Sequence, residues 1–254
     1  MAMRTFKAEY TVGRFIGEGG HGHVYEGYRK SDKKKVVIKQ ISKNRHAEGE
    51  PPIEVEMMKK LENVDGICRL IEWFEQKRDY IIIMEKTENA VDLFNFIGER
   101  GDKISEKDSL IIFKNVFKSI LALDDKNLVH RDLKPENILV NRDTLETTLI
   151  DFDSCTYKRD RPFKVFNGTE IFYPPEWFTS RRCSAEPMTV WRMGLVLYSM
   201  IKGDIPFSCV DDITDKQLDF SGFSEPIGDL IRCMLIREEK YRYDYEDLRR
   251  ALTI

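Results

Sequence analysis

The first third of the chain carries short runs of β-branched and aromatic residues, whereas the remainder repeats apolar residues at helical spacing. Turn residues separate the short runs. These runs predict strands at Tyr10–Ile16, His23–Tyr28, Val36–Ile41, Arg69–Phe74 and Tyr80–Met84. One helix is expected among the strands, since Pro52 suits a first helical position and Glu54, Met58 and Leu61 share one helical face.

The helical part begins after the polar run Glu85–Ala90. Ser105, with Asp108 three residues later, resembles a capping box, and an apolar stripe follows it. Between Thr189 and Ile201 the sequence is apolar almost all round, as in a helix buried within a larger lobe. Strands followed by helices predict an α+β fold with two segregated lobes. We expect a first domain at residues 1–86 and a second at 87–254.

Composition and charge argue against several classes of protein. The 254 residues are 41 % apolar and 33 % charged, with a net charge of −3, and no long basic stripe indicates a nucleic-acid partner. No apolar stretch is long enough to span a membrane, and the N-terminus lacks the apolar region of a signal peptide. Five cysteines without a C-x-x-C pair argue against a disulfide framework or a zinc site. A cytoplasmic or nuclear location is expected.

A glycine-rich segment lies between the first two predicted strands. It fits G-x-G-x-x-G-x-V with Gly17, Glu18, Gly19, Gly20, His21, Gly22, His23 and Val24. Glycine lets the backbone approach phosphates closely. Alone, the pattern is equally consistent with a structural turn. Its position between two strands favours a phosphate-covering loop over a dinucleotide-binding turn, which a helix would follow.

The next strand ends in Val36-Val37-Ile38-Lys39. At this distance after the glycine loop, Lys39 is interpreted as a clamp for the α- and β-phosphates of ATP, rather than as an ordinary surface lysine. A carboxylate on a helix must hold such a lysine. Glu54 is the best candidate, because Glu56 faces away from the apolar stripe of that helix.

The segment His130–Asn137 fits H-R-D-L-x-x-x-N. In this pattern Asp132 can orient the substrate hydroxyl or accept its proton, and Asn137 can bind Mg²⁺. Lys134 is typical of serine/threonine kinases rather than tyrosine kinases. Asp151 follows a short predicted strand, Thr147–Ile150, and suits a second Mg²⁺ ligand.

Two further positions complete the pattern. Asp153 stands where D-F-G has its glycine, so it adds a carboxylate beside the metal and lacks the freedom of glycine to adopt a left-handed backbone. Further on, Glu176 follows two prolines where A-P-E should be, and we expect it to pair with Arg242.

With these motifs in order, the chain resembles a protein kinase over nearly its whole length. Within that class it is most similar to the Pim serine/threonine kinases. The similarity lies in PPIEVEMMKKL, GICRLIEWFE, DLFNFIGERG, NGTEIFYPPEW and VWRMGLVLYSMIKGDIPF. It implies a two-lobed fold that binds ATP and Mg²⁺ and phosphorylates protein substrates with basic residues near the target. No membrane or nucleic-acid partner is implied, and a monomer is expected.

The same resemblance assigns the adenine pocket and part of the peptide site. The residues expected around adenine are Ile16, Val24, Val37, Met84, Glu85, Thr87, Leu139 and Ile150. Thr87 occupies a position where Pim kinases carry proline, so it has an N–H for the adenine ring. Asp92 and Glu136 retain the acidic character that attracts basic peptides, but Asn95 and Pro135 stand where the family has acids. A milder basic preference follows.

The resemblance also implies how the activation loop would be held in its active form. Arg131 next to the catalytic aspartate normally needs an anion from the activation loop, and the built-in carboxylate of Pim kinases is replaced by Asn167. We expect Asn167 to accept a hydrogen bond from Arg131. Packing of Phe163, Phe166 and Phe172 is expected to order the loop without phosphorylation.

Two alternatives remain open. A pseudokinase that binds nucleotide or acts as a scaffold would explain Asp153, Val37 and His21, although the residues that a pseudokinase commonly loses are all present. A metal site built from His21, His23 and His46 is the weaker alternative, because no cysteine or carboxylate stands at ligand spacing.

Overall fold

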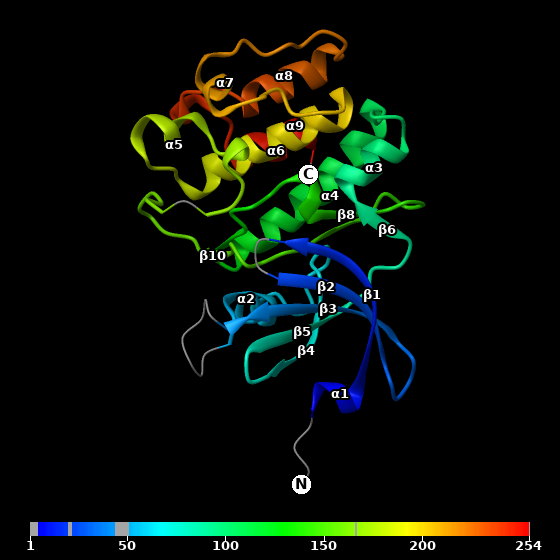
Figure 1. The fold of residues 1–254 in the computed structure, drawn as a ribbon. Helices are drawn as coiled ribbons and strands as arrows, with labels where there is room; N and C mark the ends of the chain where they lie inside the picture. The colour runs from blue at the N-terminus through cyan, green and yellow to red at the C-terminus, as the bar shows by residue number, and fades with distance from the viewer. Residues whose placement is uncertain (1–4, 20–21, 44–50, 166, 254) are drawn as a thin grey trace. The chain divides into compact units, whose positions relative to one another are not determined.

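The computed structural model describes residues 5–19, 22–43, 51–165 and 167–253. The chain forms two compact units. One runs to Glu88 and includes Asp151–Asp153, and the other comprises Asn89–Ile150 and the chain from Ser154 onward. A β-sheet dominates the first unit and helices dominate the second (Figure 1). The predicted α+β class is therefore confirmed.

An antiparallel sheet with the order β1-β2-β3-β5-β4 forms the N-terminal unit. All five predicted strands are present, and each differs from its predicted bounds by at most three residues at either end. The strands are β1 (Tyr10–Gly19), β2 (Gly22–Arg29), β3 (Lys35–Ser42), β4 (Leu70–Glu75) and β5 (Asp79–Glu85). β3 and β5 lie inside the sheet and are largely buried, as their continuous β-branched sequences favour.

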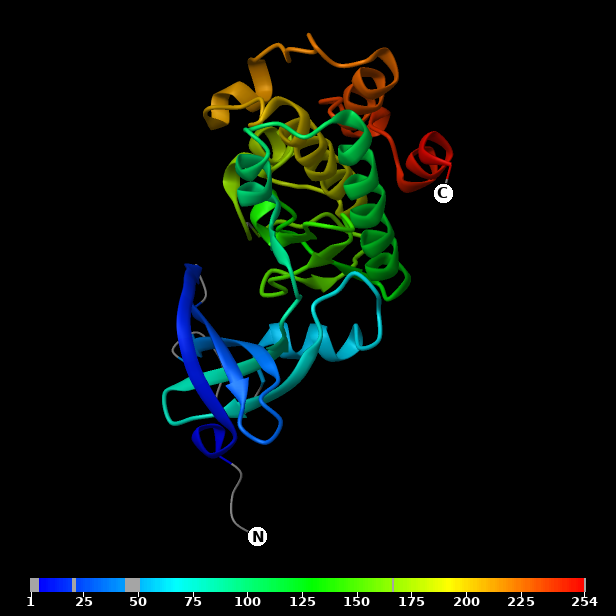
Figure 2. The same cartoon turned by 90° about the vertical axis from the view of Figure 1, so that its right-hand side faces the viewer.

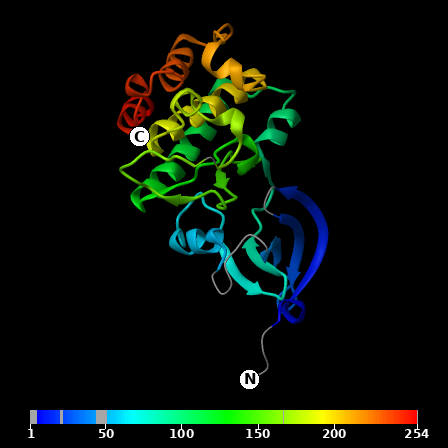
Figure 3. The ribbon, with the colours of Figure 1, turned by 60° about the vertical axis from the view of Figure 1, so that its left-hand side comes forward.

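Two short helices accompany this sheet. α1 (Phe6–Glu9) was not expected from the sequence; its Phe6 packs in an apolar cluster with Tyr10 and Ile38. α2 (Ile53–Lys60) lies beside β4 (Figure 3). The expectation for Pro52 was wrong by one position, because Pro52 is the N-cap and the helix starts at Ile53. The predicted helical face is correct, since Glu54, Met58 and Leu61 are all buried.

Helices make up most of the C-terminal unit. They are α3 (Leu93–Glu99), α4 (Glu106–Asp125), α5 (Pro175–Ser180), α6 (Ala185–Lys202), α7 (Val210–Asp215), α8 (Glu225–Met234) and α9 (Tyr245–Leu252). Ser105 caps α4 by accepting a hydrogen bond from the Asp108 N–H at 3.1 Å. α4 and α6 pack side by side (Figure 2), and α6 is buried almost all round, as its sequence predicts.

Short strands support the loops of this unit. They are β6 (Ala90–Asp92), β7 (Leu128–Val129), β8 (Ile138–Asn141), β9 (Thr147–Leu149) and β10 (Thr156–Tyr157). β6, β8 and β9 form one small antiparallel sheet, and β7 pairs with β10. The loop between β7 and β8 carries the H-R-D-L segment, so strands anchor it at both ends.

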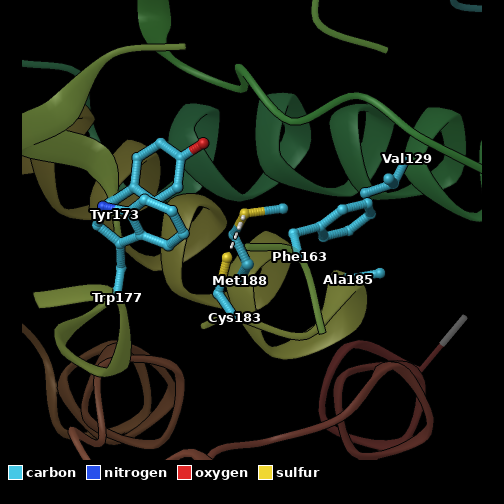
Figure 4. Packing of buried hydrophobic residues seen from close by; sticks show 7 residues of the cluster. All are labelled: Val129, Phe163, Tyr173, Trp177, Cys183, Ala185 and Met188. Atoms are coloured by element: carbon cyan, nitrogen blue, oxygen red, sulfur yellow. Dashed lines mark hydrogen bonds between the residues drawn. The ribbon is translucent and has the colours of Figure 1, made fainter. Parts of the chain in front are cut away.

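A compact apolar cluster lies where the segment after β10 meets α5 and the start of α6. Its members are Val129, Phe163, Tyr173, Trp177, Cys183, Ala185 and Met188 (Figure 4). This cluster fixes the Phe163 end of the activation segment against the start of α6. Within the ranges that the structure covers, no helix combines the length and apolar character needed to cross a membrane.

Candidate active site

One face of the N-terminal sheet gathers the expected nucleotide-binding side chains. Val37 and Lys39 are two residues apart on β3 and so point to the same side. Val24 of β2 lies opposite Lys39, and Met84 of β5 lies opposite Val37. Because directly opposed residues share a face, three apolar side chains surround the lysine on this side of the sheet.

Lys39 lies among three carboxylates. Its Nζ is 2.7 Å from Oε2 of Glu54, 2.8 Å from Oδ1 of Asp151 and 3.8 Å from Oδ2 of Asp153. The Lys39 and Glu54 side chains are only 8 % and 1 % exposed, so these charges interact with little screening by water. α2 supplies Glu54 from its first turn, and the competing Glu56 has no part in this cluster.

The charges of the cluster, together with its burial, shift the pKa values of Lys39 and Glu54. Burial alone would lower the pKa of Lys39, but Glu54, Asp151 and Asp153 together raise it, so the ammonium stays charged. Burial raises the pKa of Glu54, and Lys39 only partly opposes this effect. Three carboxylates sharing one ammonium leave an excess of negative charge, which suits a site that binds a further cation or a proton.

The glycine-rich segment forms the end of β1 and the start of β2. Gly17 pairs with Val24, Glu18 with His23, and Gly19 with Gly22. Gly22 has a φ of 155°, and a Cβ there would collide with the carbonyl oxygen of Gln40, so only glycine is accommodated. Gly20 and His21, at the expected tip, lie outside the described residues, as does His46 of the alternative metal site.

The remaining expected adenine contacts belong to both units. Ile16 is 49 % exposed on β1, whereas Met84 is buried. Glu85 ends β5, where its Oε1 accepts a hydrogen bond from Lys34 at 2.7 Å. Thr87 is half-buried, and its N–H donates to no other described residue. Leu139 on β8 and Ile150 after β9 are half-buried residues of the C-terminal unit.

Asp132 lies on the catalytic loop of the C-terminal unit, and both of its carboxylate oxygens accept hydrogen bonds. Oδ1 accepts the Thr169 N–H at 2.9 Å, and Oδ2 accepts Nδ2 of Asn137 at 3.2 Å. Lys134 Nζ lies 3.5 Å from Oδ2 and donates to Oγ1 of Thr169 at 2.8 Å. Thr169, from the activation segment, therefore contacts the catalytic loop through both its backbone N–H and its hydroxyl.

Local backbone geometry holds the loop in shape. Arg131 has a φ of 64°, which turns the chain sharply just before Asp132. His130 lies within hydrogen-bonding distance of two backbone groups: Nε2 is 3.0 Å from the Ile150 carbonyl oxygen, and Nδ1 accepts the Asp132 N–H at 3.3 Å. Asn137 Nδ2 also donates to the Asp132 carbonyl at 2.8 Å. The loop is therefore braced at both ends by side chains of its own motif.

Asp132 stays ionised in this setting. Burial pushes the pKa of its carboxyl up, but the positive charges of Arg192 and Lys134 and the Thr169 N–H outweigh burial, so the pKa lies below its ordinary value. An ionised carboxylate beside a lysine can orient a hydroxyl group and accept its proton.

Each of the two expected Mg²⁺ ligands offers an oxygen donor. Asn137 uses its Nδ2 for Asp132, which leaves the oxygen Oδ1 as its ligand atom, and Asp151 offers a carboxylate. Oxygen donors of this kind are the ones that Mg²⁺ prefers. Asp151, the expected metal ligand, has a φ of 64°, so the left-handed backbone conformation occurs at this residue. Asp153 does not have a positive φ, so its backbone takes a conformation that needs no glycine in this structure.

The two expected peptide-binding acids differ in their surroundings. Asp92 is the N-cap of α3, and both its carboxylate oxygens accept hydrogen bonds from Asn95, at 2.9 and 2.6 Å. Glu136 is exposed in the 3-10 turn Pro135–Asn137 of the catalytic loop. The Glu136 carboxylate is therefore exposed, whereas both carboxylate oxygens of Asp92 already accept a hydrogen bond from Asn95.

The activation segment differs from one expectation. Arg131 donates from Nη2 to the Val165 carbonyl at 2.7 Å and lies 4.5 Å from the Phe163 ring centroid. The expected hydrogen bond from Arg131 to Asn167 is not present, and the Asn167 Oδ1 accepts a hydrogen bond from Ser154 at 3.3 Å. Phe163 and Phe172 are buried as expected, and Phe166 lies outside the described residues.

Sequence reasoning missed one residue near Asp132. Arg192, on the buried helix α6, is 1 % exposed and reaches Oδ1 of Asp132 from Nη1 at 3.3 Å. The available signal was a single arginine inside an otherwise apolar helix, since such a charge needs a buried partner.

A sequence model of the protein kinase domain family matches residues 10–251. The chain belongs to this family. Serine/threonine-protein kinase pim-2 of Danio rerio is 38 % identical over 85 % of this chain and 74 % of its own length. Serine/threonine-protein kinase prk-2 of Caenorhabditis elegans is 34 % identical over 84 % of this chain, and PSK2 of Saccharomyces cerevisiae is 30 % identical over 95 %.

The identification of a serine/threonine-type protein kinase similar to Pim kinases is therefore confirmed. This kinase spans 49 % of the Caenorhabditis relative and 23 % of the yeast relative, so those proteins carry substantial sequence beyond the shared region. The family uses ATP as phosphoryl donor, which agrees with the nucleotide-binding character expected of the glycine-rich segment and Lys39.

Proposed function

We propose that this kinase transfers the γ-phosphoryl group of ATP to serine or threonine hydroxyls of protein substrates, with a mild preference for basic residues before the target. The observation that carries the proposal is the arrangement at Asp132. Its ionised carboxylate lies beside Lys134, and Lys134 and Asp132 both bond to Thr169. Such a carboxylate can hold a hydroxyl in line for transfer.

In the proposed reaction, Asp132 accepts the proton of the substrate hydroxyl. The hydroxyl oxygen bonds to the γ-phosphorus of ATP, and the bond between that phosphorus and the oxygen that leaves with ADP breaks. Lys39, held by Glu54, binds the α- and β-phosphates. Lys134 offsets the charge that develops on the transferred group. Bound Mg²⁺, with Asn137 and Asp151 as its proposed ligands, would supply neutralisation of the phosphate charges.

The proposed nucleotide site comprises three groups of residues. The loop from Gly17 to Val24 covers the phosphates, the N–H of Thr87 and the end of β5 bind the adenine edge, and apolar side chains enclose the ring. The enclosing side chains are Ile16, Val24, Val37, Met84, Leu139 and Ile150. Asp92 and Glu136 are the proposed contacts for basic substrate residues. We further propose a monomer that acts in the cytoplasm or nucleus.

Transfer of ³²P from labelled ATP to a basic serine peptide tests the function. Wild type should be active, and Asp132→Asn should lose roughly 10²–10⁴-fold in kcat, the range for removal of a general base. Lys39→Met should lose activity as well. Glu246→Gln, which changes a surface acid of α9, serves as the control and should leave the rate unchanged. Full activity in Asp132→Asn would overturn the assignment.

A pseudokinase remains the second candidate, because Asp153 brings a third carboxylate to Lys39. Such a protein would bind nucleotide without transferring phosphate. Two measurements on the same protein separate the two functions. Thermal unfolding with ATP, with and without Mg²⁺, reports nucleotide binding, and the transfer assay reports catalysis. Stabilisation by nucleotide without any transfer by wild type would favour the pseudokinase, whereas transfer that Asp132→Asn abolishes excludes it.

A further inference from the structure

The buried helix α6 carries one charge that packing alone does not explain. Arg192 is 1 % exposed, and the residues around it on α6 are apolar from Val190 to Leu197. Its Nε and Nη2 have no hydrogen-bond partner among the described residues, so only Nη1 is paired. A buried guanidinium with two unpaired nitrogens is a poor contributor to stability. Its presence therefore calls for a role other than holding the fold.

The hydrogen bonds of Arg192 both go to the catalytic loop. Nη1 reaches Oδ1 of Asp132 and the carbonyl oxygen of Leu133, each at 3.3 Å. The guanidinium lies over the Tyr173 ring, 4.8 Å from its centroid. Tyr173 belongs to the apolar cluster at the end of the activation segment, where it packs against Trp177 (Figure 4). Helix α6, the catalytic aspartate and the activation segment thus meet at one side chain.

The two oxygens of Asp132 have different neighbours. Oδ1 takes the Thr169 N–H and the Arg192 guanidinium, which come from the activation segment and from α6. Oδ2 takes Asn137 and faces Lys134, both from the catalytic loop itself. A Cβ on Gly168 would lie 2.7 Å from Oδ1, so the chain also encloses this oxygen sterically. Oδ1 is therefore the fixed, enclosed oxygen.

We propose that Arg192 is a positioning residue that holds Oδ1 of Asp132 from the buried helix α6, so that Oδ2 is the oxygen that receives the hydroxyl proton. This inference rests on the proposed phosphoryl transfer. Arg192 does not touch the substrate; it acts through Asp132. The orientation of the carboxylate matters because the transfer depends mainly on the positions of the reacting groups.

The test compares two substitutions of one buried side chain. Arg192→Met fills similar space without charge, and Arg192→Lys keeps the charge but loses the planar fork. The Met variant should lose roughly 10–100-fold in kcat, as expected for one charge-assisted hydrogen bond at the reacting group, with little change in KM for ATP or peptide. The Lys variant should recover part of that loss. Equal kcat values for wild type and Met, or for Met and Lys, would overturn the proposal.

Thr189→Val is the matched control, because Thr189 is a buried polar residue of α6 whose hydroxyl donates to the Ala185 carbonyl at 2.8 Å and does not reach Asp132. It should leave kcat unchanged. If it lowers kcat as much as Arg192→Met, the effect is general damage to α6 and the proposal fails. Urea unfolding of all variants is expected to give similar midpoints, which separates loss of positioning from loss of structure.

A double-mutant cycle with Asp132→Asn closes the test. Arg192→Met should cause no further loss of kcat in the Asp132→Asn background, since Arg192 acts only through that carboxylate. Additive losses would overturn the proposal. If wild type itself transfers no phosphate, the proposed function fails and the catalytic role of Arg192 fails with it. If wild type is active and only the Arg192 variants miss their expected values, this inference alone fails.

Discussion

At the scale of single residues, Asp153 is the most unusual member of the site. Its carboxylate is 6 % exposed and lies 3.8 Å from the Lys39 ammonium, which already contacts Glu54 and Asp151. A third carboxylate competes for the same ammonium and adds negative charge where the phosphates would bind. Since the backbone at Asp153 does not have a positive φ, its effect comes from charge rather than from lost flexibility.

We expect Asp153→Gly to raise kcat several-fold and to require more Mg²⁺ for half-maximal activity, because one attractive charge for the metal is lost. The measurement is a Mg²⁺ titration of kcat. Asp153→Asn is the control that removes the charge and keeps the size, and it should reproduce most of the change. An unchanged titration curve and turnover in both variants would refute this prediction.

From the sequence we could name the motif residues expected at the site, but not the side chains that contact them in the folded chain. Lys39, Asp132 and Asn137 could be named because their motifs fix the spacing along the chain, and Glu54 because it shares the apolar face of its predicted helix. Arg192 could not, because its contact with Asp132 joins positions 60 residues apart and depends on how α6 packs. The hydrogen bond from Ser154 to Asn167 was missed for the same reason, since it depends on the path of a loop.

At the scale of elements, the Arg242–Glu176 pair joins α5 to the segment before α9. Both guanidinium Nη atoms donate to the Glu176 carboxylate at 2.8 Å, and the Arg242 side chain is fully buried. The expected pairing is confirmed. Arg242 also donates to the carbonyl groups of Ile236 and Pro187, so it fastens several backbone segments at once.

Breaking this pair should destabilise the C-terminal unit. Glu176→Gln removes the charge and one acceptor, and leaves a buried guanidinium partly unpaired, at a cost of about 3 kcal/mol. Urea unfolding followed by tryptophan fluorescence would detect the loss, since Trp177 lies next to the pair. Asp229→Asn in the exposed pair with Arg232 is the matched control and should change little. Equal unfolding midpoints for Glu176→Gln and wild type would contradict the prediction.

The activation segment is a second element with a testable property. Its Phe163 and Phe172 are buried, and Arg131 already has a backbone acceptor and an aromatic partner. We therefore expect packing to order the segment without a phosphate. We predict that phosphatase treatment leaves basal activity intact, with mass spectrometry confirming the dephosphorylated loop. Activity that disappears together with a loop phosphate would overturn this expectation.

Asn167→Asp extends the same prediction. The new carboxylate would lie in the segment that contacts Arg131, and a charged acceptor forms roughly twice as strong a hydrogen bond as a neutral one. We expect a gain of a few-fold in kcat for the untreated and phosphatase-treated enzyme alike. Asn167→Leu, which cannot accept a hydrogen bond, is the comparison and should show no gain.

At the scale of the whole molecule, the fold class followed from the order of strands and helices, because period-2 and helical patterns occupy separate parts of the chain. The sheet order β1-β2-β3-β5-β4 could not be read from the sequence, since pairing of β3 with β5 skips the intervening β4. Residues Asp151–Asp153 group with the N-terminal unit although they lie far along the chain, and this too is a property of the folded chain. Local patterns determine the elements, and packing determines which of them meet.

Charge is the whole-molecule property that bears on substrates. The chain carries a net charge of −3, and of the two expected peptide-binding acids only Glu136 is exposed with an open carboxylate, whereas Asp92 is engaged by Asn95. Long-range attraction of basic peptides should therefore be present but modest. A peptide library should show enrichment of arginine or lysine before the target residue.

Three variants test the source of that preference. Asn95→Asp adds an acid beside Asp92 and should lower KM for a basic peptide roughly two- to fivefold, while Glu136→Gln should raise it by a similar factor. Asp92→Asn keeps an N-cap for α3 and should act like Glu136→Gln, but more weakly. Each effect should shrink as ionic strength rises from about 0.05 to 0.3 M, because salt screens exposed charges. A neutral serine peptide is the control, and its KM should not respond to any of the three changes. A library without basic enrichment, or equal responses of neutral and basic peptides, would show that these acids do not select the substrate.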